Sequence, residues 1–219
     1  PDRVALISAW LGIFFTITVI ASGWLVVYHK YWQLPAFMAI LCLFHFLEYW
    51  ITARYNPSKV SIDSFLFNNG SQYSLAHGAA LTEAIIEWIF FKPVKKNYSF
   101  VSILGLGLII WGQCLRSMAM IHASKNFSHI IAHHKADSHD LVKTGVYSIT
   151  RHPSYLGYFW WAIGTQLFIL NPVSTVGFSV VLWRFFNRRI KYEENLLIKF
   201  FGEEYVEYKK TTPTLIPFI

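Results

Sequence analysis

Residues 145–170 read GVYSITRHPSYLGYFWWAIGTQLFIL. The first half is polar and places an arginine, a histidine and a proline side by side, whereas the second half is a continuous apolar run with several aromatic residues. An apolar run of this kind is typical of a buried helix. The polar residues before it are then either an ordinary loop or the functional part of a membrane protein, and the rest of the chain distinguishes these cases.

The composition predicts an integral membrane protein. Of 219 residues, 54% are hydrophobic and 14% are charged, whereas soluble domains have about 25% charged residues. Because a helix needs about 20 apolar residues to cross a bilayer, we predict an all-α fold with about six transmembrane helices, at residues 4–27, 34–52, 75–91, 99–121, 154–170 and 172–186. Only Asn171 and Pro172 separate the last two, which form a tight hairpin and leave open whether each leg crosses fully.

The basic residues predict the orientation. With six helices, one face holds only four of the 19 basic residues, Lys30, Lys92, Lys95 and Lys96, and the other 15 lie on the opposite face. Short loops rich in lysine and arginine are cytoplasmic, so we place both chain ends and the 122–153 loop in the cytoplasm. The net charge of +7 is then a topology signal and an attraction to the lipid bilayer surface. It does not indicate nucleic-acid binding.

The hydrophilic residues divide the chain into two parts. Residues 1–121 hold the first four predicted transmembrane helices, and residues 122–219 form a predicted catalytic region with a cytoplasmic loop, the hairpin 154–186 and a C-terminal amphipathic helix. In the tail from residue 187, apolar residues such as Ile190 and Leu197 recur at helical spacing between charges, which is typical of a helix on a membrane surface or folded over the preceding loop. Gly202 is expected to break this helix.

The polar residues before the fifth predicted helix allow two interpretations. Pro153 fits the first turn of a helix, where its missing N–H would have had no partner. Arg151 and His152 then lie at a helix N-terminus, whose free N–H groups favour anions. In the simpler interpretation, Arg151 reaches the lipid headgroups and His152 caps the helix.

Four segments together resemble the isoprenylcysteine carboxyl methyltransferase family: LVKTGVYSITRHPSYLGYFWWAIGTQ (141–166), EENLLIKFFGEEYVEYKK (193–210), LFHFLEYWITARYNP (43–57) and DSFLFNNG (63–70). The resemblance begins near residue 34. It implies a multi-pass enzyme of the endoplasmic reticulum membrane, with its active site facing the cytoplasm. Its substrates would be CaaX proteins with a farnesyl or geranylgeranyl cysteine, whose C-terminal carboxylate is methylated after the last three residues are removed.

The same resemblance implies S-adenosylmethionine as the cofactor. A pocket for its sulfonium, adenosine and amino acid groups should offer apolar walls, electron-rich rings and a carboxylate. The residues implied to bind it meet these needs: His139, Asp140, Leu141, Val142, Tyr147, His152, Pro153, Ser154, Tyr155 and Glu193. We further expect the tail helix to close on the loop and to exclude water from the site.

Two arginines are the predicted catalytic residues. The resemblance marks Arg189 as a substrate-binding position, and Arg151 is the second candidate to hold the carboxylate through a bidentate fork. A C-terminal carboxylate has a pKa near ~3.5 and is already ionised, so no general base is required. We expect the arginines to select and orient the substrate, while a dry site supplies most of the rate.

Several other charged residues, glycines and histidines lead to separate predictions. Glu48 and Arg116 lie at similar depth and are expected to pair, with structure favoured over substrate contact. Glu83 and Glu87 are expected to be neutral and hydrogen-bonded. The glycine pairs 105/112 and 157/164 suit close helix packing. A metal site is not expected, because the histidines at positions 129, 133, 134 and 139 lack supporting cysteine or carboxylate ligands.

The sequence also allows three other functions. A phospholipid N-methyltransferase would use the same cofactor, but two arginines near the acceptor would repel an ammonium substrate. A sterol reductase would need a nicotinamide pocket. A transporter or scaffold, favoured only by the intramembrane glutamates, would not bind S-adenosylmethionine.

Overall fold

The computed structural model describes residues 2–28, 30–67, 70–90, 99–135 and 139–219. Lys92, Lys95 and Lys96, which entered the predicted charge distribution, lie outside these ranges. Every regular element in the described residues is a helix, which confirms the predicted all-α class. The α-helices are α1 (Asp2–Val27), α2 (Gln33–Tyr55), α3 (Ser71–Phe90), α5 (Ser99–Ala123), α6 (Pro153–Phe168), α7 (Pro172–Phe201) and α8 (Glu203–Thr211), and the short 3-10 helices are η1 (Pro57–Lys59), η2 (Ile62–Phe65), η3 (Ser124–Asn126) and η4 (Gly145–Ser148).

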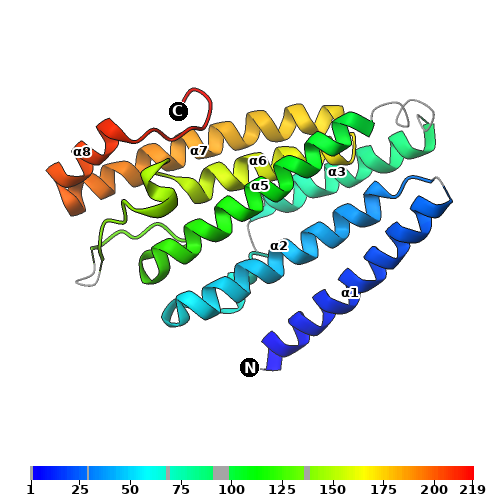
Figure 1. The fold of residues 1–219 in the computed structure, drawn as a ribbon, viewed down its shortest axis with the longest axis horizontal. Helices are drawn as coiled ribbons and strands as arrows, with labels where there is room; N and C mark the ends of the chain where they lie inside the picture. Colours follow the sequence, from blue (N-terminus) through cyan, green and yellow to red (C-terminus); the bar gives the residue numbers. More distant parts are fainter. Residues whose placement is uncertain (1, 29, 68–69, 91–98, 136–138) are drawn as a thin grey trace.

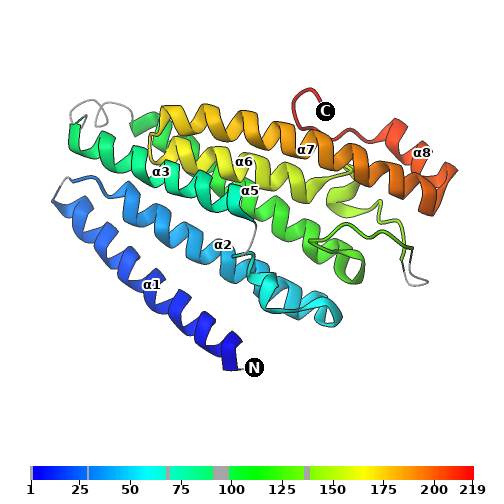
Figure 2. The same cartoon turned by 180° about the vertical axis from the view of Figure 1, so that it is seen from behind.

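The long helices form an elongated bundle. In Figures 1 and 2, α5 and α6 lie side by side near its centre, α7 and α3 run along them, and α1 lies at the outer edge beside α2. The loop residues 127–135 and 139–152 and helix α8 gather at one end of the bundle, where the second half of α7 extends past α6. The two hydrophilic parts of the sequence therefore meet at one end.

Small residues permit the close packing of α5 and α6. A Cβ atom added to Gly112 would come within 2.5 Å of the Gly157 carbonyl oxygen, and one added to Gly105 would lie 2.7 Å from that of Gly164. A side chain at either position would overlap the neighbouring backbone. The predicted packing role of these four glycines is confirmed.

The predicted six spans are supported in part. In the ranges that the structure describes, three helices have the length and hydropathy to cross a membrane: Asp2–Val27, Gln33–Tyr55 and Phe100–Asn126. Helix α6 has 16 residues, fewer than the ~20 needed. The sequence also separated the last span at residue 186 from a tail helix, but α7 is continuous over 30 residues. Phe186 and Ile190 are both buried and lie about one helical turn apart, so the same face of α7 stays packed beyond residue 186. The helix then ends at Phe201, beside the predicted break at Gly202.

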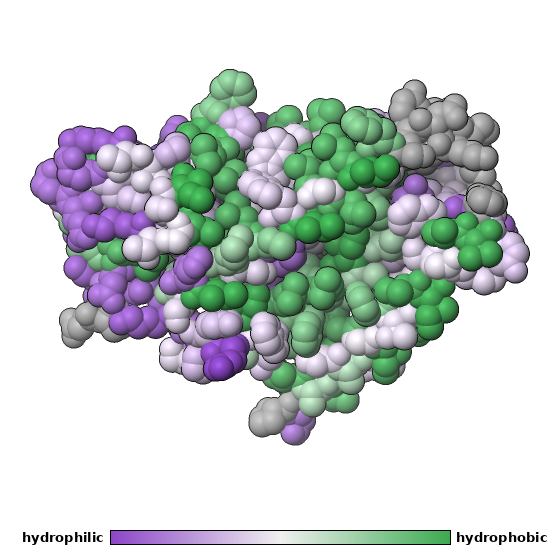
Figure 3. All heavy atoms as spheres, viewed as in Figure 1, coloured by the Kyte–Doolittle hydropathy of each residue, from purple (hydrophilic) through white to green (hydrophobic). Residues whose placement is uncertain are grey.

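The surface is divided between apolar and polar regions. Hydrophilic residues gather at the end that holds α8, and hydrophobic residues cover much of the remaining visible face (Figure 3). Large apolar side chains of α1 are exposed, including Trp10 at 67% and Ile20 at 66%. Because soluble proteins rarely expose apolar patches of this extent, this surface fits a lipid environment.

Glu83 joins α3 to the start of α7. Its carboxylate accepts hydrogen bonds from the backbone N–H groups of Val173 (2.8 Å) and Ser174 (2.7 Å), and from the Ser174 hydroxyl. Free N–H groups at a helix N-terminus favour an acceptor of this kind. Glu83 is therefore hydrogen-bonded, as predicted, and it fixes the α6–α7 turn against α3.

Candidate functional site

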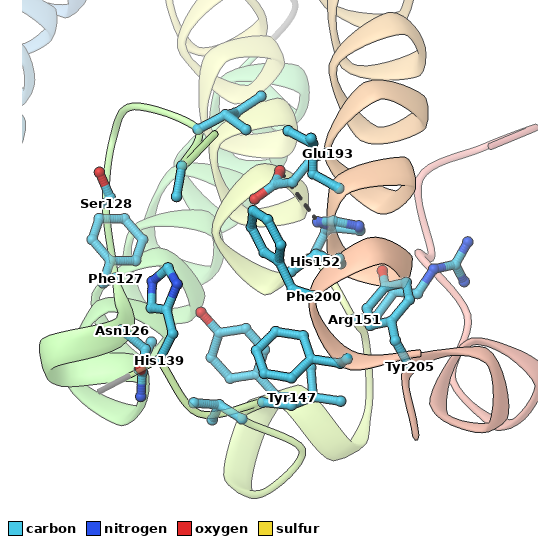
Figure 4. Close-up of a pocket in the computed structure, with 18 of the residues that line it drawn as sticks. Asn126, Phe127, Ser128, His139, Tyr147, Arg151, His152, Glu193, Phe200 and Tyr205 are labelled. Carbon is cyan, nitrogen blue, oxygen red and sulfur yellow. Dashed lines mark ion pairs between the residues drawn. The ribbon is translucent and has the colours of Figure 1, made fainter. Parts of the chain in front are cut away.

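All ten residues implied to bind the cofactor line one cavity at the polar end of the bundle, which we call the polar cavity. The loop before α6 and the second half of α7 enclose it. Figure 4 shows His139, Tyr147 and Glu193 around a common space, together with Phe200 from the end of α7. Glu193 and Tyr147 therefore line the same cavity, as expected from the sequence.

The loop reaches the cavity through a tight turn. Gly145 has a φ of +61°, a conformation that favours glycine, and a Cβ atom there would come within 2.8 Å of the His122 ring. The following turn η4 carries Tyr147 inward. His152 then occupies the N-cap position of α6 without a side-chain capping bond, and Pro153 stands in the first turn as predicted.

The C-terminal segment holds this loop in place. The Tyr208 hydroxyl donates to the Tyr147 carbonyl (2.5 Å), and the Thr150 hydroxyl donates to the Thr214 carbonyl (2.7 Å). The Arg151 N–H donates to the Pro213 carbonyl at 3.1 Å. Helix α8 and the residues after it thus act as a clamp on the cavity wall.

Arg151 also lines the polar cavity, but its guanidinium is bound by other residues of the chain. Its Nε donates to Glu194 (2.5 Å) and its NH1 to the Thr212 carbonyl (2.8 Å). In Figure 4 its guanidinium lies away from the cavity centre. Lys209 (2.6 Å) and His152 (3.3 Å) also contact the buried Glu194 carboxylate. The geometry does not support the predicted contact between Arg151 and the substrate carboxylate, because Glu194 already engages this guanidinium.

Arg189, by contrast, contacts one of the residues implied to bind the cofactor. Its Nε donates to the Tyr155 hydroxyl (2.8 Å) and its NH2 to the His129 carbonyl (2.7 Å). The Tyr155 hydroxyl in turn donates to Glu193 (2.6 Å). Within the ranges described, the Arg189 NH1 group has no hydrogen-bond acceptor, so it is available to an anionic ligand.

A second cavity of about 570 Å³, the apolar groove, lies between α3, α6 and α7. Its volume falls in the range of ligand pockets. Arg189 lines its polar end. Phe127, Ser128, Ser154 and Tyr155 line both cavities. The two spaces therefore adjoin at the start of α6, and a group held in one can reach a group held in the other.

A buried ion pair supports this junction. Arg116 donates to both carboxylate oxygens of Glu48 at 2.5 and 2.8 Å, which confirms the predicted pair. Arg116 also donates to the Ser154 hydroxyl at 2.9 Å. Glu48 is 1% exposed and Arg116 is 7% exposed. The pair thus ties α2 and α5 to the first turn of α6.

The family model of the isoprenylcysteine carboxyl methyltransferase (ICMT) family matches residues 104–199. The chain is 54% identical to a protein-S-isoprenylcysteine O-methyltransferase of Saccharomyces cerevisiae over 84% of this chain and 79% of that protein. It is 46% identical to the Homo sapiens protein of the same name, over 84% of this chain and 64% of that protein. The chain belongs to the isoprenylcysteine carboxyl methyltransferase family.

The fold of this family member agrees with a solved relative. The structure of a eukaryotic intramembrane Ras methyltransferase, ICMT, matches it with a TM-score of 0.88 and 36% sequence identity, covering 94% of this chain and 74% of that one. The family and enzyme class predicted from the sequence motifs are confirmed. These relatives give no support to the alternative of a phospholipid N-methyltransferase.

The histidines in the loop between α5 and α6 contact different groups and do not form one cluster in the described residues. Among the described residues, no group of three histidine, cysteine, aspartate or glutamate side chains could hold a metal ion. His129 lies near Glu48, at 3.8 Å, and His133 contacts the Tyr192 hydroxyl at 3.1 Å. His139 lines the polar cavity.

Because of Glu194, the stability of this methyltransferase should decrease at acidic pH. Burial raises its pKa, but hydrogen bonds from His152, Arg151 and Lys209 outweigh burial and hold the pKa well below its ordinary value of 4.5. A carboxyl whose pKa is depressed on folding stabilises the protein above its ordinary pKa, and this contribution is lost as the pH falls toward the folded-state pKa. We expect Glu194→Gln to cost about 3 kcal/mol at neutral pH.

The measurement is the melting temperature in detergent between about pH 7 and pH 2.5, because the contribution of Glu194 is lost between its ordinary pKa and its lower folded-state pKa. The difference between wild type and Glu194→Gln should narrow below pH 4.5, the ordinary pKa of this carboxyl. Glu207→Gln is the matched control, because Glu207 pairs with Lys210 on the exposed surface. A melting-temperature difference that stays constant over this range would rule out the proposed linkage.

Proposed function

We propose that the chain transfers a methyl group from S-adenosylmethionine in the polar cavity to the C-terminal carboxylate of a prenylated cysteine whose lipid lies in the apolar groove. Family membership supports the reaction. The observation that carries the assignment of the two ligands is that Phe127, Ser128, Ser154 and Tyr155 line both cavities. A methyl donor and a lipid-anchored acceptor can meet only where their sites adjoin.

The residues that line the polar cavity offer the kinds of group that S-adenosylmethionine requires. Tyr147, Phe200 and Phe127 supply aromatic walls, and Glu193 supplies a carboxylate. The buried Nδ1 atom of His139 has no hydrogen-bond partner among the described residues. Burial and the nearby Lys59 lower the pKa of His139, so its ring is neutral at pH 7 and can accept or donate one hydrogen bond to a ligand.

The bound cofactor would supply an electrophilic methyl group on a positively charged sulfur. The substrate carboxylate is ionised at neutral pH, so no side chain has to remove a proton. Arg189 lies at the junction and orients this carboxylate, with its Nε anchored on Tyr155. The clamp keeps Tyr147 closed over the site and excludes water, which would otherwise stabilise the separated charges.

Arg151 receives a different role from the one predicted. Because its guanidinium binds Glu194 and the Thr212 carbonyl, it positions His152 and the start of α6 and does not bind the substrate. The catalytic region 122–219 is completed by Arg116 from the 1–121 part, which reaches Ser154.

The proposal places the enzyme in the endoplasmic reticulum membrane with the polar cavity facing the cytoplasm. The excess of basic residues on the predicted cytoplasmic face supports this orientation. Helices α3 and α6 and the apolar first half of α7 would complete the six spans, with the 16 residues of α6 crossing only part of the bilayer. The groove, buried at membrane depth, then lets a prenyl chain stay in an apolar environment while its carboxylate reaches the cofactor.

Methyl transfer from labelled S-adenosylmethionine to N-acetyl-S-farnesylcysteine in membranes tests this function. The wild type should methylate this substrate and should not methylate phosphatidylethanolamine. Glu193→Gln should weaken cofactor binding by about 30-fold, the loss of one charge-assisted hydrogen bond, whereas Glu207→Gln should be unchanged. No transfer by the wild type would refute the function, and normal cofactor binding by Glu193→Gln would refute the cofactor assignment.

A further inference from the structure

His129 lines the apolar groove and has one unsatisfied ring nitrogen. The exposed fraction of its side chain is 19%. Its Nε2 atom is buried and has no hydrogen-bond partner among the described residues. Because buried polar atoms in native proteins almost always have a partner, this nitrogen indicates a group that is bound while the protein functions.

His129 is in direct contact with the arginine that orients the substrate carboxylate. The Arg189 NH2 group donates to the His129 carbonyl oxygen at 2.7 Å. The neighbouring carbonyl of Phe127 accepts a hydrogen bond from the Asn56 side chain at 2.8 Å, so the backbone of residues 127–129 is fixed by two other elements. Two nitrogens without an acceptor in the described part of the chain, Arg189 NH1 and His129 Nε2, therefore belong to residues that touch.

The ring of His129 is neutral at pH 7. Burial lowers the pKa of His129 to about 4. The charge of Glu48 acts against this shift, whereas the charges of Arg116 and Arg189 act with it. A neutral imidazole carries a single N–H group, on one of its two nitrogens. His129 can therefore donate one hydrogen bond to an anion without adding a full positive charge.

Nε2 is the nitrogen that can donate this hydrogen bond to a ligand. Nδ1 lies 3.8 Å from a Glu48 carboxylate oxygen, which is beyond hydrogen-bond distance. That oxygen already accepts a hydrogen bond from Arg116 at 2.8 Å. An anion beside Nε2 favours the tautomer that has its proton on this nitrogen, because a lone pair there would repel the anion.

The carboxylate of a prenylated cysteine supplies the matching acceptor. It has two oxygens, and the Arg189 NH1 group provides a charged donor for one of them. His129 provides a neutral donor for the other. A second full positive charge would stabilise the ionised carboxylate further and so oppose its attack on the methyl group. A neutral donor orients the carboxylate with less of this penalty.

We propose that His129 is a substrate-contacting residue whose Nε2–H donates a hydrogen bond to the C-terminal carboxylate of the prenylated cysteine, beside Arg189. This inference rests on the proposed function and adds a second carboxylate donor to the same site. His129 does not line the polar cavity, so binding of S-adenosylmethionine should not depend on it.

The test measures the KM values for N-acetyl-S-farnesylcysteine and S-adenosylmethionine. His129→Ala should raise the first about tenfold, the loss of one hydrogen bond to a charged group, and leave the second unchanged. His129→Gln should recover most of the loss, because its amide nitrogen can replace Nε2. His129→Asn should not, because its shorter amide corresponds to Nδ1. His133→Ala is the matched control, since His133 is exposed on the same loop and lines neither cavity.

A ligand without the carboxylate separates substrate contact from packing. N-acetyl-S-farnesylcysteamine keeps the lipid, the thioether and the amide, and its inhibition constant should be the same for wild type and His129→Ala. Equal weakening of both ligands would overturn the inference, because it indicates a packing role. Recovery by His129→Asn and not by His129→Gln would also overturn it, because it indicates a role for Nδ1 near Glu48.

The comparison of the Gln and Asn variants decides the inference even where His129→Ala does not fold. An unchanged KM for N-acetyl-S-farnesylcysteine in all three variants would overturn the inference alone and leave the proposed function intact. A wild type that does not methylate this substrate would overturn the proposed function, and the inference with it.

Discussion

Replacing Arg189 with alanine should raise the KM for a prenylated cysteine about 100-fold while kcat changes much less. The guanidinium pairs with the carboxylate before reaction and still faces it in the transition state. It therefore contributes binding that is nearly uniform along the reaction, and the loss of such binding raises KM. The Tyr155 contact of Nε and the NH1 group, which has no hydrogen-bond acceptor among the described residues, place Arg189 for this role.

Initial rates against N-acetyl-S-farnesylcysteine concentration, at saturating cofactor, give the two constants. Arg188→Ala is the matched control, since Arg188 is the exposed neighbour on α7 and lines neither cavity. Arg189→Lys should recover only part of the loss, because an ammonium lacks the guanidinium fork. A collapse of kcat at unchanged KM would contradict the uniform-binding role.

The ten residues that the family resemblance implies for the cofactor line one cavity because they lie close together in the sequence. Most of them fall between residues 139 and 155, next to a proline that begins a helix, so one local turn brings them to one cavity. The Glu48–Arg116 pair could also be predicted from the sequence, since two charges at equal depth in apolar spans have few other partners.

The clamp could not be predicted, because it depends on backbone carbonyls. The carbonyl groups of Thr212, Pro213 and Thr214 receive its hydrogen bonds, and any residue type offers a carbonyl. The orientation of Arg151 could not be predicted for a different reason: its guanidinium is bound by the Glu194 side chain, which lies 43 residues further along the chain.

The apolar groove left no sequence signal either. Gly177 and Ala76 are small residues in apolar helices, and small residues that face lipid or another helix have the same spacing. Only the packing of α3 against α7 distinguishes them. The continuity of α7 past residue 186 was likewise hidden, because the change from apolar to charged residues marks where a helix leaves the membrane and not where it ends.

Glu48→Ala should destabilise the protein by about 3–5 kcal/mol, because it leaves the Arg116 charge buried without its partner. Both oxygens of Glu48 receive hydrogen bonds from Arg116, so the substitution removes two charge-assisted bonds at once. The remaining hydrogen bond from Arg116 to Ser154 does not offset the cost of burying the unpaired guanidinium charge. The melting temperature in detergent should fall sharply.

The double variant Glu48→Leu with Arg116→Met separates stability from catalysis. Apolar residues of similar volume can replace a buried ion pair at little cost, so the double variant should recover most of the melting temperature lost in Glu48→Ala. Its methyl transfer should stay reduced, because the Ser154 hydroxyl at the cavity junction loses the Arg116 donor. A Glu48→Ala protein as stable as wild type would show that the pair does not hold α2 and α5 to α6, and full activity in the double variant would show that Arg116 does not position Ser154.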